Sequence, residues 1–167
     1  GYSHVYQYDY TGQLMGQVTS GPYDVVAVKA IHPSKKTLYY LSCEQSPMDR
    51  QLYSIKFNGK GKKQLTAAPG NHRVNVAPSG RYFIDSYSDT RTPSSTDLVD
   101  GKGKVLMNLA GHQRALNHLQ EYEYAPRELF SFTTSDGQAI DGYLIRPMNF
   151  DSTRSYPLLM AVYGGPG

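Results

Sequence analysis

The sequence has no tryptophan, a single cysteine and no long apolar run. Because Cys43 stands alone, no disulfide can form within the chain and no metal site can rest on paired cysteines. No stretch approaches the roughly 20 apolar residues that a helix needs to cross a bilayer, so the sequence predicts no membrane span. Cys43 itself is expected to be a small buried side chain.

Length and composition are those of a globular protein. The 167 residues are 39% hydrophobic and 19% charged, which suits one ordinary domain or pieces of two. The net charge of +3 is mildly basic. The densest basic cluster, Lys60, Lys62 and Lys63, alternates with glycines, which predicts a solvated turn rather than a nucleic-acid surface. No nucleic-acid partner is therefore expected.

An internal repeat is the first strong signal. The segment HPSKKTLYYLSCE from His32 aligns with APSGRYFIDSYSD from Ala77 at a shift of 45 residues. A second line, HVYQYDYTGQLMGQVT from His4, aligns with QLYSIKFNGKGKKQLT from Gln51 at a shift of 47 residues, and TDLVDGKGKVLMNL from Thr96 is a weaker third copy. Short strands and tight turns repeating at this period are typical of β-propeller blades.

The repeat predicts a mainly β fold with two complete blades and part of a third. Residues 4–19 are predicted to be the outer hairpin of one blade, with Gly12 at its turn. Residues 25–66 and 73–109 are each predicted to form four strands, with tight turns at Asn58-Gly59 and Asp100-Gly101.

The pattern changes after Gly111. Residues 113–122 lack Gly and Pro and predict a short helix, which Ala125-Pro126 ends. Residues 128–147 alternate, turn at Asp136-Gly137 and return, which predicts a hairpin out of register with the blades. The apolar run at residues 157–162 predicts a strand buried on both faces, as in the central sheet of an α/β domain. The chain is thus expected to contain blades at 1–111, a linking helix at 112–126 and the start of a catalytic domain at 127–167.

This order of segments resembles the prolyl oligopeptidase family of serine peptidases and, within it, the dipeptidyl peptidase IV branch. The segments SDGQAIDGYLIRP and YPLLMAVYGGPG carry most of the resemblance, because blade repeats alone fit many propellers. The resemblance implies the last blades of an eight-bladed β-propeller followed by the first strands of an α/β-hydrolase domain. One departure is Tyr23, which stands where the family commonly has tryptophan.

The resemblance carries one catalytic role onto the chain. Tyr163 falls where these peptidases place a tyrosine whose hydroxyl helps to form the oxyanion hole. Gly164 and Gly165 would let the backbone leave the strand sharply, and Pro166 would stiffen that exit. No G-x-S-x-G nucleophile elbow occurs in the sequence. The nucleophile, acid and histidine are expected after Gly167, and the glutamates that grip the substrate amino terminus before Gly1, so the chain alone is expected to be inactive.

The implied parent enzyme is an exopeptidase that releases N-terminal dipeptides with Pro or Ala in the second position. Its substrate would be a peptide with a free N-terminus, and no cofactor or metal is expected. Prolyl tripeptidyl and acylaminoacyl peptidases stay open as alternatives, because they share this region. A non-catalytic propeller that binds proteins is a further alternative, which the apolar run at residues 157–162 disfavours.

The resemblance also implies a periplasmic or extracellular location and a homodimeric parent. Because partial propellers expose strand edges and apolar blade faces, self-association of the isolated chain is expected.

Three other sets of residues are interpreted as structural. The first set contains residue types that bind metals, but its spacing does not suit a metal site: His112, His118, Glu121 and Glu123. The second is assigned to turns and strand ends: Asp85, Asp89 and Asp97, with Ser86, Ser88 and Ser95. The third, Gly101 and Gly103, belongs to a hairpin turn, not a phosphate loop. The loop Arg91-Thr92-Pro93 could contact substrate or a neighbouring domain.

Overall fold

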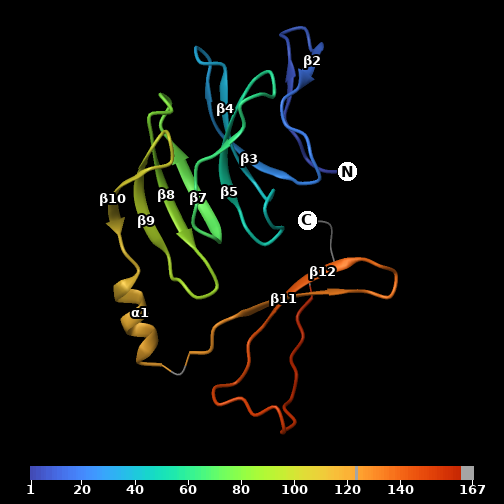
Figure 1. Cartoon of the computed structure of the whole chain (residues 1–167), viewed down its shortest axis with the longest axis vertical. Coiled ribbons are helices and arrows are strands. Elements are labelled where there is room, and N and C mark those ends of the chain that lie inside the picture. The colour runs from blue at the N-terminus through green and yellow to red at the C-terminus, as the bar shows by residue number, and fades with distance from the viewer. Residues whose placement is uncertain (123, 163–167) are drawn as a thin grey trace.

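The structure is a computed structural model that describes residues 1–122 and 124–162 (Figure 1). Its β-strands form four antiparallel sheets, in which each strand pairs with its neighbour in sequence. The first sheet is the two-stranded hairpin β1 (Tyr6–Tyr8) and β2 (Leu14–Gln17). This hairpin is the predicted outer part of a blade.

Two four-stranded meanders follow and confirm the predicted blades. The first consists of β3 (Val25–His32), β4 (Thr37–Ser42), β5 (Gln51–Lys56) and β6 (Lys63–Gln64). The second consists of β7 (Asn71–Val76), β8 (Tyr82–Ser88), β9 (Ser95–Asp100) and β10 (Val105–Ala110). The two sheets lie side by side (Figure 1).

Strand β4 is buried along its whole length because it packs on a different neighbour through each face. Tyr39 and Leu41 join Leu52 in a cluster with the buried side chains of the second blade, Val74, Phe83 and Val99. The alternate residues Leu38 and Tyr40 pack with Val18, Tyr53 and Ile55 in a second cluster toward the first hairpin. The blades are therefore stacked through successive sheet faces, as the period-two alternation of strands allows.

The sequence repeat at a shift of 47 residues is also a repeat of hydrogen bonds. The hydroxyl of Thr19 accepts a hydrogen bond from the backbone N–H of Val5 at 2.9 Å, and that of Thr66 accepts one from Leu52 at 2.9 Å. The side-chain amides of Gln17 and Gln64 donate to the carbonyls of Thr19 and Thr66, each at 2.8 Å. The threonine bonds fasten the end of each hairpin to the beginning of its first strand, and the glutamine bonds brace the returning segment itself.

After the second blade the chain forms a short helix and a separate hairpin. The helix α1 (Gln113–Gln120) and the strands β11 (Glu128–Thr133) and β12 (Ala139–Leu144) agree with the predicted elements. The hairpin belongs to neither blade sheet and lies beyond the lower ends of the blade strands in the view of Figure 1. An ion pair of 3.3 Å joins Arg146 to Glu128 across its open end.

Two expectations are corrected. Residues 157–162 form no strand, and Leu158, Leu159, Met160 and Val162 are mostly exposed. An apolar run becomes a doubly buried strand only when strands pair with it on both sides, and no described segment does so. Cys43 is half-buried rather than buried, because it lies just beyond the last residue of β4.

Tyr23, in place of the family's tryptophan, is buried. The ring centroids of Tyr23 and His4 lie 5.4 Å apart in an edge-on arrangement, and the Lys62 ammonium lies 5.3 Å from the Tyr23 ring centroid. An aromatic side chain therefore still fills this position.

Replacing Leu52 tests the packing between the two blades. Leu52 is fully buried, so Leu52→Ala should lower the free energy of unfolding by about 2–5 kcal/mol, from lost burial and the cavity left behind. Leu106, on the exposed strand β10, provides a matched control, because Leu106→Ala should cost far less. Urea unfolding followed by circular dichroism measures both changes, and equal losses would contradict the assigned core.

Candidate functional site

The predicted catalytic residue, Tyr163, lies outside the residues that the structure describes, as do Gly164, Gly165 and Pro166. Its oxyanion role therefore stays a prediction. Within the described residues, three features are candidates for a site: the buried network at the crossing between the two blades, a crevice beside it and a groove near the first hairpin.

The buried network centres on the carbonyl oxygen of Ala68, in the segment that leads from β6 to β7. This oxygen accepts a hydrogen bond from Gln51 Nε2 at 2.9 Å and faces His72 Nε2 at 2.8 Å. The other end of the Gln51 amide accepts a hydrogen bond from the Thr66 hydroxyl at 2.6 Å. Gln51, Thr66 and His72 are all buried, so the crossing segment is held by side chains of both blades.

His72 faces hydrogen-bond acceptors through both ring nitrogens. Nδ1 lies 2.9 and 2.8 Å from the two carboxylate oxygens of Asp85, while Nε2 faces the Ala68 carbonyl. A carbonyl and an ionised carboxylate cannot donate, so both contacts are satisfied only when each nitrogen carries a hydrogen. The geometry therefore favours the imidazolium form of His72, paired with the Asp85 carboxylate.

The surroundings of His72 also favour its charged form, because they raise its pKa. Burial alone would lower the pKa of His72, but the hydrogen bonds to Asp85 and to the Ala68 carbonyl outweigh it and raise that pKa above its ordinary value. The charges of Asp85 and Asp49 add to this effect, and the ring of Tyr87 stacks on the imidazole at 5.3 Å. Geometry and surroundings both favour the charged form of His72, with Asp85 as its buried partner.

The predicted turn and strand-end role is wrong for two of the three aspartates. Asp85 lies within β8 and Asp97 within β9, both buried, where they are opposite each other in the strand pairing. Asp97 accepts a hydrogen bond from Asn108 Nδ2 at 2.6 Å. Asp89 does have the predicted role, since its carboxylate accepts hydrogen bonds from the backbone N–H groups of Arg91 and Thr92.

Sequence reasoning missed His72, although one signal was present. In the aligned repeat, Asp85 stands opposite Tyr40, which is fully buried in the first blade. An acid at a position that is apolar in the other copy requires a buried partner. The nearest candidate across the β7–β8 pairing is His72.

A crevice of about 590 Å³ lies between the loops of the blades and the β11–β12 hairpin. The blade wall includes Asp49, Gly70 and the loop from Ser88 to Arg91, and the hairpin wall includes Arg127 and Tyr143. The guanidinium of Arg127 lies 5.2 Å from the Tyr143 ring centroid. The loop containing Arg91 therefore borders the neighbouring hairpin.

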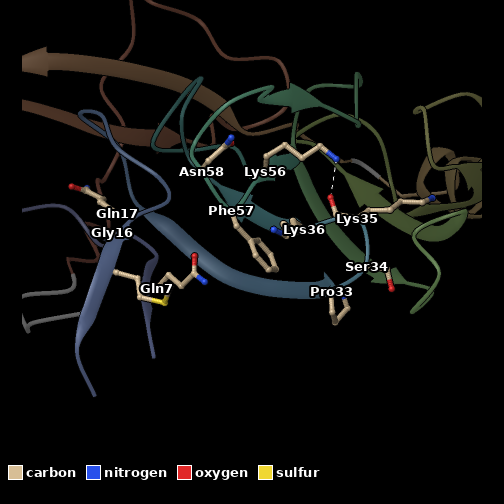
Figure 2. A pocket seen from close by; sticks show the side chains of 11 residues that line it. Gln7, Gly16, Gln17, Pro33, Ser34, Lys35, Lys36, Lys56, Phe57 and Asn58 are labelled. Carbon is tan, nitrogen blue, oxygen red and sulfur yellow. Dashed lines mark hydrogen bonds between the residues drawn. The ribbon is translucent and has the colours of Figure 1, made fainter. Parts of the chain in front are cut away.

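A groove of about 940 Å³ lies between the first hairpin and the turns of the first blade (Figure 2). Phe57 extends into it between Gln7 and the turn that contains Pro33 and Lys36 (Figure 2). At the equivalent corner one blade later, the ring of Tyr39 from β4 approaches Gly80 so closely that any Cβ there would overlap it. In the second blade, therefore, the corner that corresponds to the groove is filled by a side chain of β4, an inner strand of the blade before it.

Comparisons with known proteins agree with the blade architecture. A family model described as the dipeptidyl peptidase IV (DPP IV) N-terminal region matches residues 1–94. The chain belongs to this dipeptidyl peptidase IV family. The crystal structure of Porphyromonas gingivalis dipeptidyl peptidase 4 matches the structure with a TM-score of 0.85 and 30% identity, over 94% of this chain and 22% of that one.

Curated relatives of the dipeptidyl peptidase IV family match along the chain as well. A probable dipeptidyl peptidase 4 of Arthroderma benhamiae is 27% identical over 100% of this chain and 22% of its own length. A probable dipeptidyl-aminopeptidase B of Penicillium rubens is 30% identical over 90% of this chain and 17% of its own length. The chain thus spans about a fifth of the relatives it matches.

The pH dependence of unfolding tests the charged state of His72. A histidine whose pKa is raised in the folded state contributes stability that is complete below its unfolded pKa of about 6.5 and is lost as the pH rises through its folded pKa. Urea midpoints measured from mildly acidic to alkaline pH should therefore show this loss in the wild type and not in His72→Gln. At acidic pH the variant should be less stable by about 3 kcal/mol, because Asp85 is left buried without its cation.

His118→Gln is the matched control for this titration. His118 is exposed, and its Nδ1 lies 3.7 Å from Oε2 of Glu121. Its replacement should therefore leave the pH dependence of the urea midpoint unchanged. Parallel pH profiles for the wild type and His72→Gln would contradict a buried imidazolium at His72.

Proposed function

We propose that the protein containing this chain is a serine exopeptidase that releases N-terminal dipeptides, with Pro or Ala in the second position, from peptides with a free N-terminus. The observation that carries the proposal is the match with the P. gingivalis dipeptidyl peptidase 4 structure, which at a TM-score of 0.85 covers the blades and continues through 94% of the chain. Relatives named dipeptidyl peptidase 4 and dipeptidyl-aminopeptidase B support the same activity.

The proposed division of the chain is propeller blades at 1–111, a linking helix at 112–126 and the start of an α/β-hydrolase domain at 127–167. The separate β11–β12 hairpin supports this division, because its strands add to neither blade sheet. A propeller that only binds proteins would not require such a hairpin beside its last blade. The crevice between blades and hairpin would then lie between the two domains.

Tyr163 is the residue of this chain proposed to take part in the chemistry. Its hydroxyl would donate a hydrogen bond to the oxygen that becomes negative in the tetrahedral intermediate of peptide hydrolysis. Such a donor stabilises the transition state more than the substrate, because the charge it meets develops only during the reaction.

The proposed location is periplasmic or extracellular, and the proposed assembly is a homodimer. Among residues 1–122 and 124–162, no helix is both long and apolar enough to span a membrane.

Removing the hydroxyl of Tyr163 tests both the activity and the assignment. In the full-length protein, a Gly-Pro chromogenic substrate should be cleaved, and Tyr163→Phe should lower kcat by about 10²–10³-fold with little change in KM, because one oxyanion donor is lost. Tyr122→Phe, at an exposed tyrosine, should leave both constants unchanged.

The other outcomes separate the alternatives. Cleavage of only blocked or longer peptides would point to an acylaminoacyl or tripeptidyl peptidase. If no peptide is cleaved, the exopeptidase proposal is wrong; if Tyr163→Phe loses affinity but not kcat, the oxyanion role is wrong.

A further inference from the structure

Basic side chains from four separate turns lie at one end of the two blades. In an antiparallel meander, the first and third turns of each sheet lie at the same end of its strands. In the first blade these turns contribute Lys35 and Lys36, between β3 and β4, with Lys56, Lys60 and Lys63 around the turn between β5 and β6.

The second blade contributes further basic side chains at the same end. Arg81 lies in the turn between β7 and β8, and Lys102 and Lys104 lie in the turn between β9 and β10. All of these lysines and arginines are exposed in both blades. We name this set of turns the basic end.

Hydrogen bonds join the turns of the basic end into one surface. Within the first blade, the backbone N–H of Phe57 donates to the carbonyl of Lys36 at 2.9 Å, and within the second, that of Gly101 donates to Arg81 at 2.7 Å. The two blades are connected by the Lys63 ammonium, which donates to the carbonyl of Lys102 at 2.9 Å. The charges are therefore held near one another rather than on independent loops.

Apart from Glu44, which pairs with Lys62, little negative charge compensates the basic end. The acid at its turns is Asp100, the last residue of β9, whose carboxylate accepts hydrogen bonds from the backbone N–H groups of Lys102 and Lys104. The opposite end of the blades has no such basic excess, because Asp49 and Asp89 there accompany Arg50 and Arg91. The blades are thus strongly polarised from end to end.

The residues at the tips of these turns indicate the class of partner. They are Pro, Ser, Asn, Gly, Lys and Arg at residues 33–36, 58–62, 78–81 and 101–104; the nearest aromatic residues, Phe57 and Tyr82, flank these ranges. Single-stranded nucleic acids bind through stacking aromatics, and membrane surfaces take up apolar and aromatic side chains. The tips of these turns therefore offer charge and hydrogen bonds, with Phe57 in the groove beside them, and such tips fit a hydrated, flexible polyanion.

We propose that the basic end binds an acidic polysaccharide, through the sulfate, carboxylate or phosphate groups along its chain. This binding surface is independent of the proposed peptidase activity, because it lies at the end of the blades opposite the crevice and the hairpin.

Heparin, a sulfated polysaccharide, is the probe for the test. Titration of the full-length protein with labelled heparin at low salt should show binding whose Kd rises steeply with sodium chloride, as expected for contacts made by charge. The triple variant Lys35→Glu, Lys60→Glu and Lys102→Glu should bind at least about tenfold more weakly, because each change replaces an attractive contact by a repulsive one. None of the three ammonium groups makes a hydrogen bond or ion pair within the described residues.

The matched control removes the same charge elsewhere. The triple variant Arg73→Glu, Arg114→Glu and Arg154→Glu changes the net charge equally at exposed positions outside the basic end, and should keep most of the affinity. Circular dichroism and the Gly-Pro assay report whether each variant is folded.

Three results would overturn the proposal. One is the absence of salt-sensitive heparin binding, and another is an equal loss of affinity in the two triple variants, which would mean that only net charge matters. The third is tighter binding to oligo(dT) or to vesicles of phosphatidylcholine and phosphatidylglycerol than to heparin.

Discussion

One backbone carbonyl, that of Ala68, fixes how the first complete blade is joined to the second. It lies in the crossing segment, where a chain without regular strand pairing must still satisfy its polar groups. Gln51 reaches it from β5 and His72 from β7. The neighbouring backbone bonds, Arg50 N–H to Gly70 and His72 N–H to Arg50, then bind the loop after β4 to the same segment. The blade wall of the crevice is built from these loops.

The stacking of blades depends equally on where side chains are absent. Gly80 has a positive φ of 61°, and a Cβ at this position would overlap the hydroxyl oxygen of Tyr39. Gly103, in the turn between β9 and β10, also lies close to the first blade, because a Cβ there would be 2.6 Å from the Leu65 carbonyl oxygen. The Tyr39 ring on β4 and the Leu65 backbone after β6 thus pack against turns of the following blade that lack side chains, and these contacts limit the distance between the sheets.

The blades could be predicted from the sequence because the repeat shows where each strand and turn of one copy corresponds to a strand and turn of the next. Strand, turn and strand recur at nearly constant spacing, and the Thr19 and Thr66 hydrogen bonds show that the alignment is also structural. The pairing of His72 with Asp85 was not predicted, because the one signal, an acid at the repeat position of Tyr40, becomes informative only once that position is known to be buried. The run at residues 157–162 was assigned to a strand from its apolar character, but strand formation also requires partners that no described segment supplies.

The same topology explains why the basic end is invisible in any single stretch of sequence. A lysine-rich turn such as residues 60–63 is ordinary by itself, and its solvated character is confirmed by exposure at Lys60, Lys62 and Lys63. The meander then returns the chain to the same end twice in each blade, so charges separated by about 45 residues in the repeat add on one surface. Because the intervening loops are directed to the other end, the lysines accumulate without altering the loops that meet the hairpin. A propeller blade can therefore carry two surfaces of different charge, because each surface is formed by its own set of turns.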